Sequence, residues 1–399
     1  MSIVLEKVLE DIYRGLEDPE FSEAISRSVS NAEGKHLRVK EMYPYVEELR
    51  LQVLEAKKKA LENIDYYIDQ LARSLERNHG VLHIAGDRDE AQKILGDLVG
   101  SGKLVVFSKS IVAEELGLRE HLESLGNRVW ETDLGQLLIQ LEHGKPMHTT
   151  APAVHLTIEQ AARLVREKLG VELPSSPEPE DIVSAVRRFL REIYYRADVG
   201  VSGANAVAAD TGSIVLVENE GNIRLVTGYP PIHIAVTGIE KIVPTLNDAI
   251  SYALVQAAYA GLFPPTYLNV ISGPSNTADI EHKRVYGAHG PRELHLVLID
   301  NGRRRALLDP GLRDHLRCIR CGRCQWECPV WHHTANRWGG PTYGGPMGVL
   351  WTAITLGKEA GAELSMLCLG CARCDEVCPM EIPLSMLIRG LKRVYSSKI

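Results

Sequence analysis

Two matching cysteine runs near the end of the chain constrain its fold more than any other feature. All eight cysteines of the 399 residues lie in them, and each run reads C-x2-C-x2-C-x3-C followed by proline. The first consists of Cys318, Cys321, Cys324 and Cys328, the second of Cys368, Cys371, Cys374 and Cys378. Because this spacing binds a cubane [4Fe-4S] cluster, the repeat predicts two [4Fe-4S] clusters.

The fourth cysteine of each run stands apart from the first three. In two-cluster ferredoxins it ligates the other cluster, because three intervening residues and a proline direct it away from its own run. We therefore expect one cluster on Cys318, Cys321, Cys324 and Cys378, and the other on Cys368, Cys371, Cys374 and Cys328.

The same cysteines could in principle form disulfides or bind zinc. Disulfide scaffolds are usually short secreted chains, whereas this chain is long and has no cysteine outside the two runs. Structural zinc sites use paired C-x2-C segments, which a triple repeat with a following proline fits poorly. Iron–sulfur binding is the preferred interpretation.

Composition excludes some classes of function. A net charge of -7 and a pI near 6.1 argue against nucleic-acid binding, which requires a basic surface. The longest apolar helical pattern, 249–263, is shorter than a membrane span and ends at Pro264. Residues 1–10 lack the layout of an export signal, so we expect a cytoplasmic protein without a transmembrane segment.

The pattern before the cysteines predicts helices followed by an α/β region. Residues 3–77 are expected to be helical, as a short helix followed by a long helix that begins near Pro44. The long helix is expected either to pack on the next domain or a partner subunit, or to be a solvated strut. Short apolar runs alternating with amphipathic segments then indicate a parallel sheet with crossover helices. The expected strands are 81–85, 103–107, 129–132, 148–151, 213–217, 232–236, 268–271 and 293–299, and the expected helices are 89–99, 113–125, 134–141, 177–196 and 249–263.

A glycine-rich stretch in the middle of the chain is the second candidate site. It contains a loop at 200–205, a turn at 210–212 and a polar cluster at 218–222. Small residues let backbone N–H groups approach a ligand, and open α/β sheets bind ligands at the carboxyl ends of their strands. The alternative is plain turn geometry. His233, inside an apolar strand, is expected to be a core side chain. No G-x-G-x-x-G follows a strand, and Gly96–Lys103 fails as a phosphate-binding loop.

Several stretches together resemble the iron–sulfur subunit of the lactate-utilisation system, in which a lactate-utilisation (LUD) domain precedes a two-cluster ferredoxin domain. The matching stretches follow the family order and are 108–110, 131–135, 151–155, 203–205, 210–212, 217–222, 230–233, 238–244, 272–279 and 289–291. The chain ends 21 residues after Cys378, whereas the family usually continues further. The 39 residues between Cys328 and Cys368 are similar to the helical two-cluster modules of succinate dehydrogenases and heterodisulfide reductases.

The resemblance implies an organisation and a function. It implies an N-terminal helical segment (1–79), a LUD α/β domain like sugar-phosphate isomerases and coenzyme A transferases (80–305), and a mainly helical two-[4Fe-4S] ferredoxin domain (306–399). The function implied is L-lactate oxidation to pyruvate together with two other subunits. Candidate cofactor-binding residues in the middle domain are Gly203, Asn205, Asp210, Thr211, Gly212, Glu218, Asn219, Ser275 and Asn276.

Two kinds of function remain open at this point. The chain can be a non-catalytic electron relay between a cysteine-rich or flavin-bearing partner and an acceptor. The complex would then oxidise lactate or be another multi-subunit oxidoreductase. Alternatively, the LUD domain itself binds and oxidises a small hydroxy acid. Arg320, Arg323 and Arg373 within the runs either raise the cluster potentials or form solvated surface.

Overall fold

The structure is a computed structural model that describes residues 3–396. The expected end segments, 1–79 and 306–399, therefore extend beyond it by residues 1–2 and 397–399. Four helices come first: α1 (Ile3–Leu16), α2 (Pro19–Met42), α3 (Val46–Glu62) and α4 (Ile64–Arg77). The segment is helical as predicted, but its first part is two helices rather than one short piece, and the long part breaks at Asn63.

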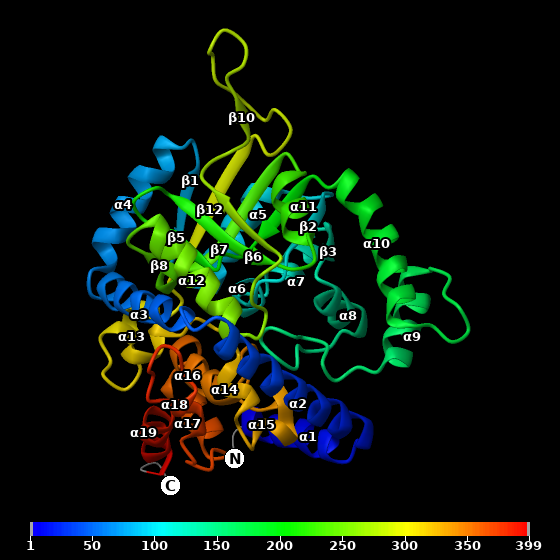
Figure 1. The fold of residues 1–399 in the computed structure, drawn as a ribbon, viewed down its shortest axis with the longest axis vertical. Helices are drawn as coiled ribbons and strands as arrows, with labels where there is room; N and C mark the ends of the chain where they lie inside the picture. Colours follow the sequence, from blue (N-terminus) through cyan, green and yellow to red (C-terminus); the bar gives the residue numbers. More distant parts are fainter. Residues whose placement is uncertain (1–2, 397–399) are drawn as a thin grey trace.

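A six-stranded parallel sheet forms the centre of the molecule (Figure 1). Its order is β1 (Val81–Ala85), β12 (Glu293–Ile299), β7 (Ile232–Gly238), β4 (Val199–Ser202), β2 (Leu104–Phe107) and β3 (Arg128–Glu131). Inner strands such as β2 are buried along their whole length, as apolar runs covered on both faces should be. The α/β prediction is confirmed.

Side chains alternate between the two faces of this sheet. On β12, Val297 and Ile299 pack with helices on one face, whereas Leu296 and Leu298 pack with α4 on the other. The helices of this region are α5 (Arg88–Val99), α6 (Ile111–Glu115), α7 (Leu118–Ser124), α8 (Leu134–Glu142), α9 (Ile158–Leu169), α10 (Pro179–Arg196), α11 (Asn222–Gly228) and α12 (Leu246–Tyr259).

A second, smaller sheet lies beside the α4 face. Its order is β8 (Ile242–Val243), β5 (Ala206–Ala208), β6 (Ser213–Glu218) and β9 (Tyr267–Ile271). A hairpin of β10 (Asn276–Thr277) and β11 (Val285–Tyr286) projects from the body at the top of Figure 1. β10 lies within the 272–279 stretch of the family resemblance.

The cysteine-bearing end of the chain is helical. It comprises α13 (Arg303–Leu307), α14 (Arg323–Trp326), α15 (Trp331–Thr334), α16 (Gly345–Thr355), α17 (Lys358–Ser365), α18 (Arg373–Glu376) and α19 (Leu384–Ser396), with 3-10 turns η2 (Arg313–Arg317) and η3 (Ala335–Arg337). The remaining 3-10 turn, η1 (Ile239–Lys241), belongs to the sheet region, between β7 and β8. Figure 1 shows α1 and α2 beside this region, below the sheet. Ile12, Phe21 and Val53 of the N-terminal helices share one apolar core with Trp331 and Trp351. The N-terminal segment packs on the rest of the chain, and the solvated-strut alternative is wrong.

Some predicted elements are wrong or have different bounds. Residues 148–151 are not a strand, because the backbone N–H groups of Thr150 and Ala151 turn back to donate to Nδ1 of His148. The helix predicted at 113–125 divides at Gly117, which has a φ of 60°. Gly200 lies inside β4 rather than in a loop, and the helix predicted at 249–263 is α12, which ends at Tyr259.

Candidate functional site

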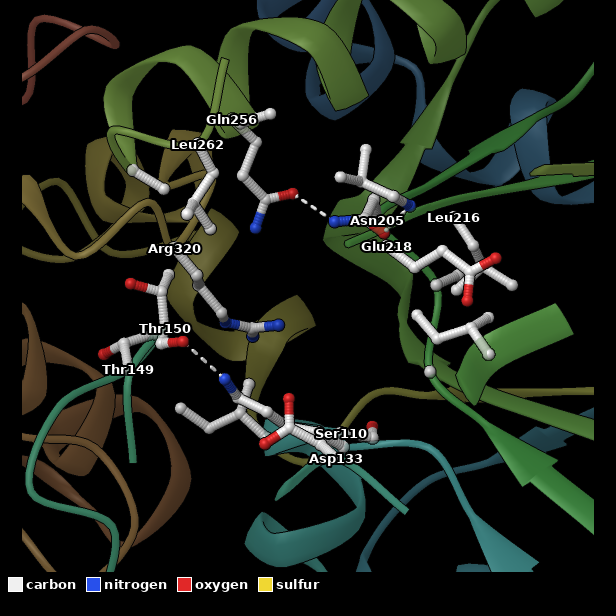
Figure 2. Close-up of a pocket in the computed structure, with 18 of the residues that line it drawn as sticks. Ser110, Asp133, Thr149, Thr150, Asn205, Leu216, Glu218, Gln256, Leu262 and Arg320 are labelled. Carbon is white, nitrogen blue, oxygen red and sulfur yellow. Dashed lines mark hydrogen bonds between the residues drawn. The ribbon is translucent and has the colours of Figure 1, made fainter. Parts of the chain in front are cut away.

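A pocket of about 430 Å³ opens at the carboxyl ends of the large-sheet strands. Lys109 and Ser110 follow β2, and Asp133 follows β3. Glu218 ends β6 of the small sheet, and Gln256 comes from α12. The pocket also includes a residue of the cysteine region: Figure 2 shows the Arg320 guanidinium directed into its centre. The pocket therefore lies between the sheet region and the first cysteine run.

Four of the nine predicted cofactor-binding residues line this pocket: Gly203, Asn205, Glu218 and Asn219. Gly203 allows the end of β4 to approach α6, because a Cβ there would lie 2.9 Å from Oγ of Ser110. The Asn205 side-chain amide joins two walls, since it donates to Oε1 of Gln256 (2.7 Å) and accepts from the backbone N–H of Val217 (2.9 Å).

The other five predicted residues lie elsewhere. The turn of Asp210, Thr211 and Gly212 packs on α4, where the carbonyl of Asp210 accepts from Ser74 Oγ at 2.9 Å. A Cβ on Gly212 would lie 2.6 Å from the backbone nitrogen of Leu75, so this glycine permits a helix contact rather than a ligand contact. Ser275 and Asn276 stand at the base of the β10–β11 hairpin, where Ser275 Oγ accepts from the N–H of Gly290. None of these five candidate residues lines the pocket.

Buried charges form a network behind the pocket. Glu240, fully buried, binds Nε of Arg303 at 2.5 Å and Nη2 of Arg320 at 2.6 Å, and its backbone carbonyl accepts from Nζ of Lys57 at 2.5 Å. Arg303 also pairs with Glu115 at 2.8 Å. Burial alone would raise the pKa of Glu240, but the neighbouring Arg303 and Arg320 hold it at about 2.

Lys241 is the second buried cation that lines the pocket. It is 3 % exposed, and its Nζ lies 5.0 Å from the centre of the Tyr252 ring. Burial, then repulsion by Arg320, lowers its pKa well below the usual value for lysine, while Glu240 opposes the shift. Lys241 belongs to the 238–244 stretch of the family resemblance. Its burial was not evident from the sequence, because the fold brings η1 next to Arg320 of the first cysteine run.

The opposite wall of the pocket is acidic, but its carboxylates already have partners. Glu218 accepts from Nε of Arg224 at 2.7 Å and from Asn269 at 3.0 Å. Asp133 caps α8 through the N–H of Gln136, and Glu220 accepts from the N–H of Leu134. Arg224, which could have faced a ligand, instead pairs with Glu218 and stacks on Tyr267.

The eight cysteines surround two separate cavities. Cys318, Cys321, Cys324 and Cys378 line the first, together with Ile319, Met347 and Ile382. Cys328, Cys368, Cys371 and Cys374 line the second, together with Val330, Leu369 and Pro346. In each cavity three cysteines come from one run and the fourth comes from the other run.

The chemistry of these thiols fits a metal cluster. Burial raises the pKa of Cys321 to about 12, and the backbone N–H of Arg323 opposes that shift. Burial likewise raises the pKa values of Cys328 and Cys378 to about 11. Converging buried sulfurs would stay protonated on their own, whereas iron supplies the positive charge that stabilises thiolates.

His233 is buried in the sheet as expected and pairs with Ser202 Oγ at 2.8 Å.

The three arginines of the cysteine runs have different environments. Arg320 and Arg323 are 2 % and 5 % exposed, and Arg323 pairs with Glu327 at 2.5 Å. Arg373 is exposed. The solvated-surface alternative therefore holds for Arg373 and is wrong for the other two.

Comparisons with known proteins agree with this architecture. A LUD domain model matches residues 68–299, and a 4Fe-4S dicluster domain model matches residues 314–382. The chain is thus a LUD domain joined to a 4Fe-4S dicluster domain. It belongs to the LUD-domain family that includes lactate utilization protein B. Among the described residues 3–396, no helix combines the length and apolar character needed to span a bilayer.

Relatives match along nearly the whole chain. Lactate utilization protein B of Bacillus licheniformis is 35% identical over 403 residues, covering 100% of this chain and 82% of its own length. The uncharacterized electron transport protein YkgF of Escherichia coli is 34% identical, covering 97% of this chain and 80% of its own length. A crystal structure of a duf162 family protein from Deinococcus radiodurans aligns with 59% of this chain and 98% of its own, at 16% identity and a TM-score of 0.31.

Proposed function

We propose that this protein is an electron-transfer subunit of a complex that oxidises L-lactate, or a related 2-hydroxy acid, to pyruvate. Matches to both lactate utilization protein B and a 4Fe-4S dicluster domain support this proposal. When bound, the clusters would accept and pass on single electrons. The observation that carries the proposal is the grouping of eight thiols around two cavities in one domain.

We further propose the crossed ligand sets. Cys318, Cys321, Cys324 and Cys378 would hold one cluster, and Cys328, Cys368, Cys371 and Cys374 the other. The composition of the two cavity walls supports this assignment. The chain's own residues fix the second run to α19: Asp375 accepts hydrogen bonds from Ser385, and Lys392 donates to the carbonyl of Cys368 at 2.6 Å.

The proposed division of the chain is 1–79, 80–305 and 306–399. It is supported by the strands, which all lie between Val81 and Ile299 in the described part of the chain. An isomerase- or coenzyme A transferase-like fold for the middle part is also a proposal, supported by the parallel sheet with its crossover helices.

The partner would be a further subunit that bears a flavin or clusters of its own. The second cavity supports a docking position, because Cys371 is exposed and Leu369 beside it is 71 % exposed. A small electron-transfer interface needs such an accessible cofactor edge.

Metal analysis and a dye assay test the proposal. Anaerobically prepared protein should contain about eight irons and about eight acid-labile sulfides. Reduced by dithionite, it should pass electrons to an artificial acceptor, yet it should not reduce that acceptor with lactate alone. Zinc without sulfide would refute the cluster assignment.

The second candidate is a LUD domain that oxidises the hydroxy acid itself. Arg320 favours it, because this residue lines the pocket and lies between two proposed cluster ligands. Lactate-dependent dye reduction by the isolated chain would support this function over the relay.

A further inference from the structure

The pocket has one wall of buried, incompletely paired cations. Arg320 donates from Nη2 to Glu240, but its buried Nε has no hydrogen-bond partner among residues 3–396. Lys241 Nζ lies 5.0 Å from the centre of the Tyr252 ring. Both side chains are at least 97 % buried and line the pocket. Buried charges of this kind normally have a counter-ion.

The balance of buried charges behind this wall also favours an anionic ligand in the pocket. Four buried basic side chains lie together here, namely Lys57, Lys241, Arg303 and Arg320. Their carboxylate partners are two, Glu115 and Glu240. The excess of positive charge lies where the pocket meets the first cysteine run, so an anion in the pocket would gain attraction that no protein carboxylate has used.

The opposite wall restricts how much negative charge a ligand can carry. Asp133, Glu218 and Glu220 line the pocket and disfavour a dianion, although each already accepts a hydrogen bond from the protein. Between the two walls, Gln256 accepts from Asn205 through its oxygen, and its amide nitrogen stands on the pocket side in Figure 2. This arrangement suits a monoanion with one further polar oxygen.

We propose that the pocket binds a small monocarboxylate bearing a hydroxyl or oxo group, with Lys241 and Arg320 holding the carboxylate, and that its binding lowers the reduction potential of the neighbouring cluster. Arg320 stands between Cys318 and Cys321 in sequence, so a carboxylate that offsets its charge removes stabilisation from the more negative, reduced state. By linkage, reduction weakens binding equally. A tenfold weaker affinity of the reduced protein corresponds to a fall of about 59 mV for a one-electron couple.

Calorimetric titration of the full, cluster-loaded and oxidised chain tests the binding. The probes are L-lactate, pyruvate, acetate, neutral lactamide and inorganic phosphate. Lactate or pyruvate should bind, whereas lactamide and phosphate should bind at least about tenfold more weakly, because lactamide lacks the charge and phosphate carries too much. Equal binding of lactamide, or no heat with any carboxylate at millimolar concentration, would overturn the proposal.

Two lysine variants separate direct contact from general charge. Lys241→Met should weaken carboxylate binding at least about tenfold. The matched control is Lys57→Met, which removes a buried charge from the same network but not from the pocket wall, and it should have a clearly smaller effect. Iron and sulfide content of each variant verifies that the clusters are intact. Equal effects of the two variants would contradict the proposed contact.

Redox titration tests whether the bound ligand lowers the reduction potential of the neighbouring cluster. Saturating lactate should lower the midpoint potential of one cluster in the wild type and not in Lys241→Met. The potential shift rests on the proposed cluster function, whereas ligand binding does not. Clusters with normal potentials but no ligand effect would therefore refute this inference and leave the relay standing. A potential that changes in Lys241→Met without any ligand binding to the wild type would show that the cations balance only the cluster, and would also refute it.

Discussion

The two cysteine cavities have the same sequence spacing but different surroundings. The first is enclosed: Ile319 is 1 % exposed, Arg320 pairs with Glu240 of the sheet region, and Arg50 of α3 donates to the carbonyl of Pro379 at 2.8 Å. The second faces outwards, with Cys371 and Leu369 exposed. The spacing of the cysteines sets what they can bind, whereas the rest of the chain sets how each site is insulated and charged.

Replacing the fourth cysteine of one run should produce the largest difference between the two cavities. Cys328→Ala should remove the cluster of the outward-facing cavity, and Cys378→Ala that of the enclosed cavity, because each cysteine crosses to the other run. Iron should fall by about half in either variant. Paramagnetic resonance of the reduced proteins would identify the surviving cluster, and the opposite assignment would show that the runs do not cross.

Removing the charge of Glu240 should destabilise the enclosed side alone. Glu240→Gln leaves Arg303 and Arg320 without their shared carboxylate, which should cost about 3–5 kcal/mol of unfolding free energy. Urea denaturation would measure it. The control is Glu381→Gln, whose exposed carboxylate pairs with Arg50 and should be worth at most about 1 kcal/mol. Similar losses in both variants would mean that the buried network is no stronger than a surface pair.

A matched pair of truncations compares the apolar linings. Ile319→Ala in the enclosed cavity should cost about 2–5 kcal/mol, because a fully buried side chain leaves a void. Leu369→Ala beside the other cavity should change stability by less than about 0.5 kcal/mol, because the side chain is mostly in solvent. Thermal or urea unfolding of both variants checks this, and a large loss for Leu369→Ala would indicate that this surface is covered in solution.

Acid should weaken the enclosed side through His148. This ring stacks on Trp326 with centroids 3.8 Å apart, and burial lowers its pKa to about 3, while the Gly322 carbonyl opposes that shift. The unfolded state, with a pKa near 6.5, binds the proton first, so stability is lost as pH falls from about 6.5 towards 3, at about 1.4 kcal/mol per pH unit. His148→Gln should flatten this dependence between pH 6.5 and 5.5 in urea titrations, and an unchanged slope would contradict the role of His148.

Local sequence patterns predicted much of the fold. The bounds of β1 and β12 match the structure, since apolar β-rich runs bounded by glycine and polar residues form strands. The failed strand at 148–151 shows the limit: a histidine side chain bonding to its own backbone competes with strand pairing. Helix α9 was missed, although Thr157 and Gln160 form a capping box at its start.

The candidate pocket was less predictable than the fold. Glycine-rich turns at 203–205 and 210–212 look alike in sequence, yet one lines the pocket and the other accommodates α4. A glycine indicates a close approach without saying to what. Lys57, Glu240, Arg303 and Arg320 meet only in three dimensions, because each comes from a different part of the chain, and no local pattern encodes their pairing.

The contact of α1 and α2 with α14, α15 and α17 has a consequence for biosynthesis. These partners are separated by about 300 residues of chain, so the helices at the start must wait until the cysteine-bearing end has left the ribosome. Until then Phe21 and Ile25 lack the apolar surface that covers them. Closure of the N-terminal helices is therefore a late step in folding.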